Sequence, residues 1–568
     1  MSTKGAAEDT DLLMVHADDL DPVLETSVAA SEAEAEAEDP PLEDPEHLWD
    51  ESREANDLDA QGWGVVAPEG PAGDELLGRI QRLIAHRRAQ QNGREVLKYR
   101  VPPKQTAAEA MRWRKRVFAG PQSRHLELPR YLLILGDLDQ VSAELQVVMG
   151  AQGYVGRLAF DRLEDYEAYV DKLLRWEKQP APIDQARIIF HTVRDRTKAT
   201  TVGHRALMEP GVALARTYKD QGEFPASTLI EVEHGYTPKP GPLIEEAVKT
   251  EPGVLFTISH GAGAPRRGWR SVAEQRVMQG GMSFGRSGGL LTGEALAGRP
   301  FMPGGVWFML ACFGAGTPAA SKYAEWLRGL GEAGHFQGSP DAVLSSLATD
   351  GRPFTAAVPK AVLASPDGPL AFIGHVDLAW TYSFRELDDE EPVNRPNRFL
   401  DVFYGLLRHD RVGVAFRELL RHYGETNTEL TTLIESRVDD PQRRGHLWML
   451  RNDLAGYVLL GDPAAQLPIE PAPQTLGSMI DDPFAAVGFT PSVSPRQDLR
   501  AQQPVVDEPE QNIDPEVLER AIGLHLVGEL GPAKIIDTCK LALTTREFER
   551  KVKRYKEAGR RALGLPPD

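Results

Sequence analysis

Short apolar runs alternate with amphipathic stretches through the middle of the chain. Segments with apolar residues at helical spacing, such as EDYEAYVDKLLRWEK and SKYAEWLRGLGEAG, lie between several of these runs. Because strands that alternate with helices form layered domains, the pattern predicts an α/β fold with a mostly parallel central sheet. The apolar runs are RYLLILGDLDQ (130–140), ARIIFHTV (186–193), GVLFTISHGAG (253–263), GGVWFMLACFGAG (304–316), AVLASPDGPLAFIGHVD (361–377) and AGYVLLGDPAAQL (455–467).

The two ends of the chain differ from its middle. Residues 1–60 include EAEAEAEDPPLEDPEHLWDE, and we expect a disordered acidic tail there because like charges repel and little can be buried. Residues 467–510 are rich in Pro, Ser and Gln and are interpreted as a linker. Helical spacing returns over 511–568 and predicts a small helical module. The main domain therefore spans 61–466, with its core over about 130–466.

The net charge of −20 is concentrated at the amino end. Residues 1–60 carry a net −18, so the other 508 residues carry only −2, and the total charge says nothing about a substrate of the main domain. The basic stretch REFERKVKRYKEAGRRALG is interpreted as a solvated helix face, so nucleic acid is not an expected partner. The alternatives for this stretch are a nucleic acid, an anionic surface or the chain's own acidic tail.

The cysteines and the amino-terminal residues point to a reducing compartment. Cys312 and Cys539 are the only two cysteines, too few for a disulfide framework. No C-x-x-C or H-E-x-x-H motif predicts a zinc site. The start MSTKGAAEDTDLLMVHADD lacks the regions of a signal peptide, and no apolar run reaches the roughly 20 residues that span a bilayer. We expect a reduced, cytoplasmic protein with no membrane partner.

Polar and reactive side chains follow several of the predicted strands directly. In parallel α/β sheets, functional residues gather just beyond the carboxyl ends of the strands. This rule selects Gly136-Asp137, Ser259-His260-Gly261, Cys312 and the stretch from His375 to Trp380.

Cys312 and His260 form a candidate catalytic pair. Most lone cysteines are inert core residues, but Cys312 ends its strand and precedes FGAG, whose glycines allow a tight turn with exposed N–H groups. His260 ends another strand 52 residues earlier, an interval similar to that of caspases. A thiolate can attack a carbonyl while an imidazole takes the thiol proton and returns it to the leaving amine. The N–H groups of Gly261 and Cys312 would face the developing oxyanion.

FTISHGAG and WFMLACFGAG resemble the His-Gly and Ala-Cys strand ends of the caspase-like clan of cysteine proteases. Within that clan the sequence is most similar to the gingipain family. RYLLILGD, GTPAASKYAEWLRG, LAFIGHVDLAWTYSF and GYVLLGDPAAQLPI resemble further gingipain segments in the same order, over about 130–467. There is also some likeness to the CHAT branch of the clan. The resemblance implies a caspase-like three-layer sandwich and a cysteine endopeptidase that needs no cofactor.

The resemblance assigns roles to individual residues. Cys312 matches the nucleophile, His260 the catalytic histidine, Gly261 the residue that lends an oxyanion N–H, and Trp380 the aromatic wall of the specificity pocket. The nucleophile sequence is not the caspase Q-A-C-R-G, so the resemblance implies no cleavage after Asp.

The acid that binds basic substrate side chains in gingipains has no clear match. Asp377 and Asp137 are the candidates for that role. His375 lies next to the expected pocket and is a candidate substrate contact.

Together these residues predict an intracellular cysteine endopeptidase acting on a protein or peptide substrate. Gingipains are secreted, whereas this sequence shows no signal peptide. The flanking segments suggest regulation, by a protein partner that binds 511–568 or the acidic tail. Analogy with intracellular relatives in the clan suggests a role in bacterial defence or cell death.

Three other interpretations compete. FGRSGG contains a G-x-S-x-G motif at Ser287, which would be the nucleophile elbow of a serine hydrolase if a strand preceded it and a helix followed. FGAGTPAAS fits a dinucleotide fingerprint, although the acidic residue expected on a second strand is missing. The domain would otherwise be a catalytically silent scaffold. His234 in EVEHGY is interpreted as a turn or core histidine.

Overall fold

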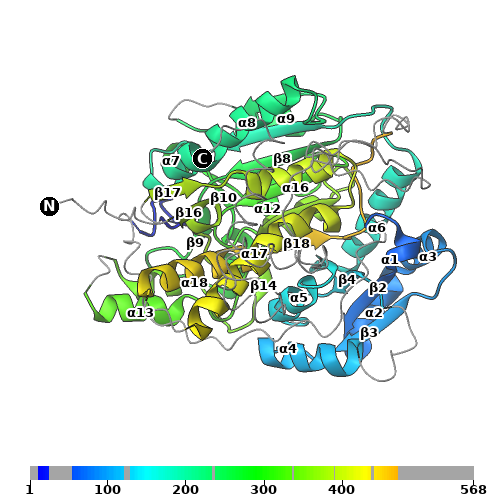
Figure 1. Ribbon diagram of the computed structural model, residues 1–568, viewed down its shortest axis with the longest axis horizontal. Coiled ribbons are helices and arrows are strands. Elements are labelled where there is room, and N and C mark those ends of the chain that lie inside the picture. The colour runs from blue at the N-terminus through cyan, green and yellow to red at the C-terminus, as the bar shows by residue number, and fades with distance from the viewer. Residues whose placement is uncertain are drawn as a thin grey trace, which may run out of the picture. The chain divides into compact units, whose positions relative to one another are not determined.

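A ten-stranded sheet runs through the part of the chain that the computed structural model describes, namely residues 11–24, 54–119, 128–232, 237–334, 338–388, 391–436 and 440–470 (Figure 1). The strand order is β3-β2-β4-β5-β18-β15-β12-β8-β6-β7. The strands are β2 (Trp63–Pro68), β3 (Leu97–Val101), β4 (Tyr131–Leu135), β5 (Tyr154–Leu158), β6 (Arg187–Thr192), β7 (Leu229–Val232), β8 (Gly253–Ile258), β12 (Val306–Leu310), β15 (Ala371–His375) and β18 (Tyr457–Gly461).

The sheet is mostly parallel, which confirms the predicted fold class. Strands β3, β2, β4 and β5 run parallel to one another, and so do β15, β12, β8, β6 and β7. Strand β18 runs antiparallel to β15. Each apolar run contains one of these strands, but the first residues of the run 361–377 belong to helix α15 (Ala357–Ala364) instead.

Strands buried on both faces explain the continuous apolar runs. All five residues of β12 are buried. On one face, Trp307 packs against Phe301 and Phe372 with ring centroids 4.7 and 5.1 Å away. On the other face, Phe308 packs against Phe256 and against Phe399 of helix α16 (Asn397–Leu407). Helices therefore cover both faces, and the fold has three layers.

Helix α17 (Val412–Glu435) packs beside α16 on one side of the sheet, while α6 (Leu163–Lys178) contacts α15 on the other. In Figure 1, α8 and α9 lie along one edge and the blue strands β2 and β3 lie toward the opposite edge. The remaining helices are α1 (Leu58–Gln61), α2 (Pro71–Arg79), α3 (Gln81–Gln90), α4 (Ala107–Trp113), α5 (Ala143–Gly150), α7 (Lys198–Gly203), α8 (Glu209–Asp220), α9 (Pro240–Ala247), α10 (Val272–Met278), α11 (Gly285–Gly288), α12 (Gly293–Leu296), α13 (Ala324–Glu332), α14 (Pro340–Leu344) and α18 (Pro441–Ala455). Short π-helical or 3-10 turns cover Arg114–Phe118, His204–Met208 and Thr381–Phe384.

A small second sheet has the order β1-β9-β10-β11, from β1 (Met14–His16), β9 (Gly261–Gly263), β10 (Met282–Ser283) and β11 (Leu290–Leu291). Two hairpins complete the strands: β13 (Gly316–Thr317) with β14 (Phe354–Thr355), and β16 (Arg385–Asp388) with β17 (Glu391–Asn394).

Strand β1 corrects the sequence analysis. The prediction of a disordered tail is wrong for residues 11–24, since β1 pairs in parallel with β9 (Figure 1, dark blue). Four consecutive apolar residues explain the order: Leu12, Leu13, Met14 and Val15 are at most 3% exposed. They form a short hydrophobic island among acidic residues, which the composition of the whole tail conceals. The linker from residue 471 onward and the module 511–568 lie outside the described residues.

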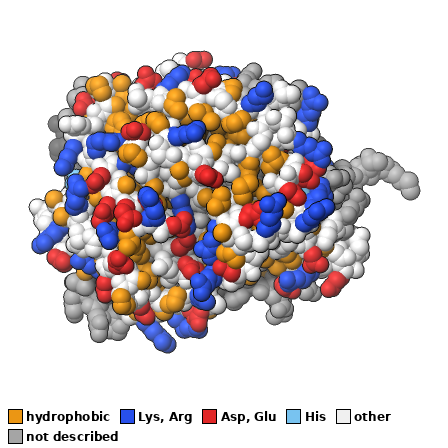
Figure 2. Space-filling model, turned by 180° about the vertical axis from the view of Figure 1, so that it is seen from behind, with side chains coloured by type: hydrophobic (Ala, Val, Ile, Leu, Met, Phe, Trp, Pro, Cys, Tyr) orange, Lys and Arg blue, Asp and Glu red, His pale blue; other side chains and the backbone are white. Residues whose placement is uncertain are grey.

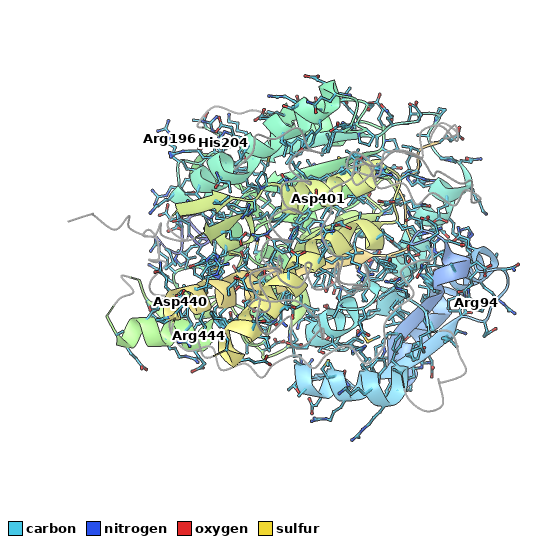
Figure 3. All side chains as sticks on the ribbon, viewed as in Figure 1. Arg94, Arg196, His204, Asp401, Asp440 and Arg444 are labelled. Atoms are coloured by element: carbon cyan, nitrogen blue, oxygen red, sulfur yellow. The ribbon has the colours of Figure 1, made fainter. Side chains whose placement is uncertain are left out.

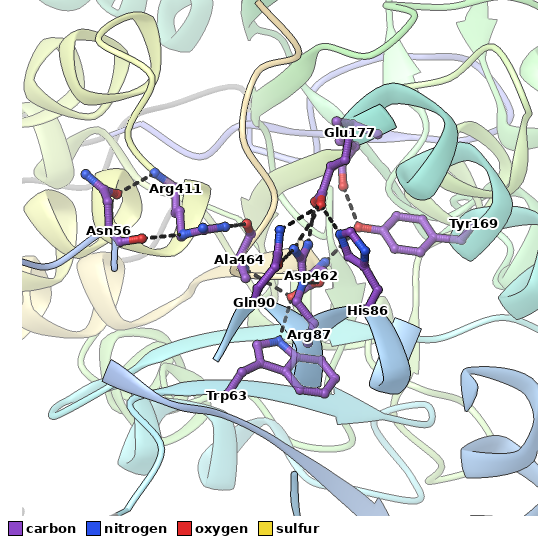
Figure 4. Close-up of polar contacts among 11 residues, drawn as sticks. Asn56, Trp63, His86, Arg87, Gln90, Tyr169, Glu177, Arg411, Asp462 and Ala464 are labelled. Atoms are coloured by element: carbon purple, nitrogen blue, oxygen red, sulfur yellow. Dashed lines mark hydrogen bonds and ion pairs between the residues drawn. The ribbon is translucent and has the colours of Figure 1, made fainter. Parts of the chain in front are cut away.

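A buried ion network ties the amino-terminal helices to the carboxyl end of β18 (Figure 4). The Arg87 side chain of α3 is fully buried and contacts Glu177 at 2.6 Å and Asp462 at 2.9 Å. The Asp462 carboxylate also accepts a 3.0 Å hydrogen bond from the Trp63 indole. The network is compensated because each buried charge has an opposite charge in contact.

The charged side chains of the surface are mixed. On the face shown in Figure 2, basic and acidic side chains are interspersed, in keeping with the small net charge outside residues 1–60. Among the described residues, none of the helices has both the length and the apolar character that a membrane crossing requires.

Candidate active site

The ends of β8 and β12 bring His260 and Cys312 to the same edge of the sheet. The two strands pair in register up to Ile258 and Leu310, and the Ser259 N–H extends the pairing by donating to the Leu310 carbonyl at 3.2 Å. His260 and Cys312 follow two residues after those strand ends. Both side chains are buried, at 1% and 0% exposure. The strand-end rule thus predicted the proximity of these two segments correctly.

Gly261 allows the two strand ends to approach closely. A Cβ atom at Gly261 would overlap the carbonyl oxygen of Cys312, so only glycine fits here. After Cys312 the chain turns at once, because Phe313 has a φ of 56° in the left-handed region.

Two backbone N–H groups at this point converge on one carbonyl oxygen. The Gly261 N–H donates to the Leu13 carbonyl at 2.9 Å, and the Cys312 N–H donates to the same oxygen at 3.2 Å. The Cys312 thiol contacts the backbone of Ala379, whose N–H lies 3.2 Å from Sγ. A carbonyl held in this way is polarised toward an oxyanion beside a thiol, which is the geometry that acyl transfer requires.

The tautomer of His260 follows from a network of hydroxyl groups. The Thr197 hydroxyl donates to Asp195 Oδ1 at 2.8 Å and Thr200 donates to the same oxygen at 2.7 Å. Since the Thr197 proton is used there, its oxygen accepts from His260 Nε2 at 2.8 Å. His260 Nδ1 then carries the free lone pair, and it has no hydrogen-bond partner among the described residues. The ring is therefore oriented with Nδ1 available as a base.

Asp195 supports this histidine electrostatically. Its Oδ2 atom lies 3.9 Å from His260 Nε2. Burial lowers the pKa of His260, and the negative charge of Asp195 opposes that shift. Burial raises the pKa of the Cys312 thiol. With the site covered as it is here, histidine and cysteine are thus both held neutral.

Sequence reasoning missed Asp195, although a signal was available. Asp195 follows the end of β6, the strand next to β8, so the same strand-end rule would have selected it. Figure 3 labels the neighbouring Arg196 near α7. Sequence reasoning also missed Leu13, because it lies in a segment predicted to be disordered.

Trp380 lies close to the pair but is packed into the core. Its ring is fully buried, with centroids 5.7 Å from Tyr323 and 5.4 Å from Trp326. Leu12 forms an antiparallel bridge to Trp380 through the backbone. The wall assigned to Trp380 therefore stands beside the Leu12–Leu13 segment, and its role in substrate binding stays a prediction.

Asp377 and His375 are held by their own neighbours. The Asp377 carboxylate accepts hydrogen bonds from the Ser321 hydroxyl at 2.9 Å and from the Lys322 and Leu378 N–H groups at 3.1 and 2.8 Å. The two ring nitrogens of His375 lie 3.1 and 3.0 Å from the carbonyls of Asp377 and Asp453. These contacts position the backbone of 375–380, and a direct contact with substrate stays a prediction for both side chains.

Asp137 is engaged in an ion pair. Its Oδ2 lies 2.7 Å from Lys360 Nζ, and its Oδ1 accepts from the Thr355 N–H at 2.6 Å. The lysine lowers the pKa of the carboxyl against the effect of burial, which acts in the opposite direction. Its proposed contact with substrate stays a prediction.

The competing motifs lack the structural context that they need. Ser287 is exposed on the four-residue helix α11, which follows only a two-residue strand, β10. The segment FGAGTPAAS enters β13 rather than a helix directly after β12, so the dinucleotide geometry is not formed. His234 lies outside the described residues. Within the described ranges, no group of three or more His, Cys, Asp or Glu side chains is arranged to hold a metal ion.

No protein-family model and no curated protein matches the sequence. The chain is similar to three solved structures of interest. One is described as a protease (12% identity, TM-score 0.41, 71% of this chain and 78% of that chain). The Arg-specific cysteine proteinase gingipain R shares 14% identity (TM-score 0.34, 72% and 78%), and the Saccharomyces cerevisiae separase–securin complex shares 12% (TM-score 0.26, 61% and 16%). At these values the likeness does not decide the function, which must be argued from the site.

Proposed function

We propose that this chain is a cysteine endopeptidase with Cys312 as nucleophile and His260 as general acid and base. The observation that carries the proposal is the convergence of the Gly261 and Cys312 N–H groups on one peptide carbonyl oxygen, beside a buried thiol and an oriented imidazole. An inert core cysteine has no need of such donors. The sequence resemblance to gingipains supports the same assignment.

The reaction follows from these groups. His260 Nδ1 takes the thiol proton as Sγ attacks the carbonyl carbon, and the Gly261 and Cys312 N–H groups stabilise the oxyanion. The peptide C–N bond then breaks as His260 gives the proton to the leaving amine. Water, activated by the same imidazole, hydrolyses the thioester and regenerates the thiol. Asp195 and Thr197 act as positioning residues, since they fix the tautomer of the ring.

The test uses the full-length chain and a fluorogenic peptide library varied at the residue before the scissile bond. Cys312→Ala should abolish turnover, because no other group replaces the thiolate, while the midpoint of thermal unfolding stays near that of the wild type. Ser287→Ala is the matched control and should retain activity. Full activity in Cys312→Ala, or loss in Ser287→Ala alone, would refute the assignment and favour the serine hydrolase.

Other parts of the expected function remain proposals. A cytoplasmic location, regulation by a protein partner through 511–568 or the acidic tail, and a role in bacterial defence or cell death have no support in the described residues. The silent scaffold is the second candidate function. It would gain weight if the wild-type chain neither cleaved peptides nor reacted at Cys312 with an electrophilic peptide probe.

A further inference from the structure

The segment Asp11–His16 passes through the candidate active site in an extended form. On the amino side of Leu13, its N–H donates to the Ala379 carbonyl at 3.4 Å and Leu12 bridges antiparallel to Trp380. On the carboxyl side, β1 pairs in parallel with β9, directly after His260. The chain therefore contacts one wall before the Leu13 carbonyl and the other wall after it.

We propose that this segment occupies the substrate groove as a substrate does, with the Leu13–Met14 bond at the reacting position. The inference rests on the proposed function and adds two things to it. The site accepts peptides with leucine or a similar aliphatic residue on the acyl side of the scissile bond. The chain also carries a built-in occupant that restrains its own active site.

The position of the Leu13 carbonyl supports the register. Its oxygen accepts from both Gly261 and Cys312, and these are the N–H groups that would stabilise the oxyanion of a scissile peptide. No neighbouring carbonyl of the segment could take this place, because successive carbonyls of an extended chain point in opposite directions.

The burial of Leu13 supports the choice of substrate. Its side chain is 0% exposed and belongs to the main hydrophobic core. The acids nearest to this segment are already satisfied: Asp377 accepts from Ser321, Lys322 and Leu378, and Asp453 accepts from the Trp380 and Ser383 N–H groups at 2.9 Å each. A basic side chain would find these two carboxylates occupied. The geometry therefore departs from the basic specificity that a gingipain-like pocket would have.

A latch of polar contacts holds the segment after the scissile bond. His16 Nδ1 lies 2.5 Å from the Ala264 carbonyl, and the Arg266 guanidinium contacts Asp19 at 2.8 Å. Arg286 pairs with Asp21. The latch keeps Met14 in place after cleavage, so that its amine remains beside the acyl carbon and can reverse the first step. This retention makes the segment a slow substrate, in effect an inhibitor.

The covalent step balances without any further reactant than water. Sγ of Cys312 bonds to the Leu13 carbonyl carbon, the Leu13–Met14 C–N bond breaks, and the thiol proton passes through His260 to the Met14 amine. Water then converts the thioester to a Leu13 carboxylate and restores the thiol.

The first arm of the test measures coverage of the thiol and needs no catalysis. The full-length chain is treated with iodoacetamide, and peptide mapping separates Cys312 from Cys539. Leu13→Asp should expel the segment, since a charge is costly to bury, and should speed alkylation of Cys312 by about tenfold or more. Leu13→Met, the matched control, should stay within about twofold of wild type because it conserves volume and polarity. Arg286→Ala, which loosens the latch without touching the groove, should speed alkylation about two- to fivefold. Equal rates in wild type and Leu13→Asp would overturn the proposal.

The second arm measures specificity with the Leu13→Asp chain. Acetyl-Asp-Leu-Leu-aminomethylcoumarin should exceed acetyl-Asp-Leu-Arg-aminomethylcoumarin in kcat/KM by about tenfold or more, since a basic side chain would leave its charge unpaired in an apolar site. A preference for arginine would overturn the substrate assignment while leaving the proposed function intact. If Cys312 became reactive but neither peptide was cleaved, the proposed function would fail together with the substrate assignment, and only the occupant would stand.

Discussion

At the residue scale, His260 depends on an acid that does not touch the substrate. Asp195 raises the pKa of His260 while burial lowers it. In Asp195→Asn the imidazolium loses its counter-charge, so the pKa of His260 should fall further and the ascending limb of the kcat/KM–pH profile should move to lower pH. A weaker and less firmly oriented base should also reduce kcat by about 10- to 100-fold.

The measurement is a pH–rate profile of the full-length chain with a cleaved peptide. Thr201→Val is the control, because its hydroxyl donates only to the Thr197 carbonyl on the exposed side of α7. A lower kcat with an unmoved limb would mean that Asp195 acts through structure alone.

The sequence predicted the central pair but not its setting. His260 and Cys312 could be found because each follows a strongly apolar strand, and burial on both faces makes such strands easy to recognise. Asp195 could not be singled out, since the short loop between β6 and this aspartate carries no motif, and its role depends on Thr197 and Thr200 folding back onto it.

At the element scale, the site depends on how closely the β8–β9 turn approaches the end of β12. In Gly261→Ala the new methyl group would overlap the Cys312 carbonyl. The turn must then shift, which should cost about 1–3 kcal/mol of unfolding free energy. Activity should fall more than stability does, because the same shift moves the Gly261 N–H away from the substrate carbonyl.

Urea unfolding and kcat/KM of the two variants provide the measurement. Gly329→Ala on α13 is the matched control: nothing lies near its added Cβ, so its stability should change by less than about 1 kcal/mol, in the favourable direction. Native activity in Gly261→Ala would contradict the close approach.

Elements of regular length were predictable, and the three-residue strand β1 was not. Its order comes from partners more than 200 residues away, at Gly261–Gly263 and Ala379–Trp380. Local composition recorded only the acidic residues around it. Those acids are themselves part of the order, since Asp19 and Asp21 pair with Arg266 and Arg286.

At the scale of the whole molecule, the Arg87 network joins parts of the chain that are far apart in sequence. Arg87 belongs to α3, Glu177 to the end of α6, and Asp462 follows β18. No sequence pattern linked these residues, because each is an ordinary charged residue until the fold buries it. Their packing holds the amino-terminal strands to the strands that carry the site.

This network predicts how the molecule responds to acid. Burial would raise the pKa of Glu177, but Arg87 and His86 outweigh it and lower the pKa to about 2. A carboxyl whose pKa is lower in the folded state stabilises the fold above its unfolded pKa, and this contribution disappears as the pH falls toward the folded pKa. Glu177 should therefore account for a loss of about 2 kcal/mol in unfolding free energy between pH 5 and pH 3.

Urea unfolding of wild type and Glu177→Gln at a series of pH values tests this prediction. The variant should be less stable at pH 7, and the difference should shrink as the pH falls, since a protonated carboxyl and the amide that replaces it are both neutral. Glu325→Gln is the control, because Glu325 pairs with Arg328 at the surface with an 89% exposed side chain and should show no such convergence. A constant difference between wild type and Glu177→Gln from pH 7 to pH 3 would mean that Glu177 contributes through packing and not through its charge.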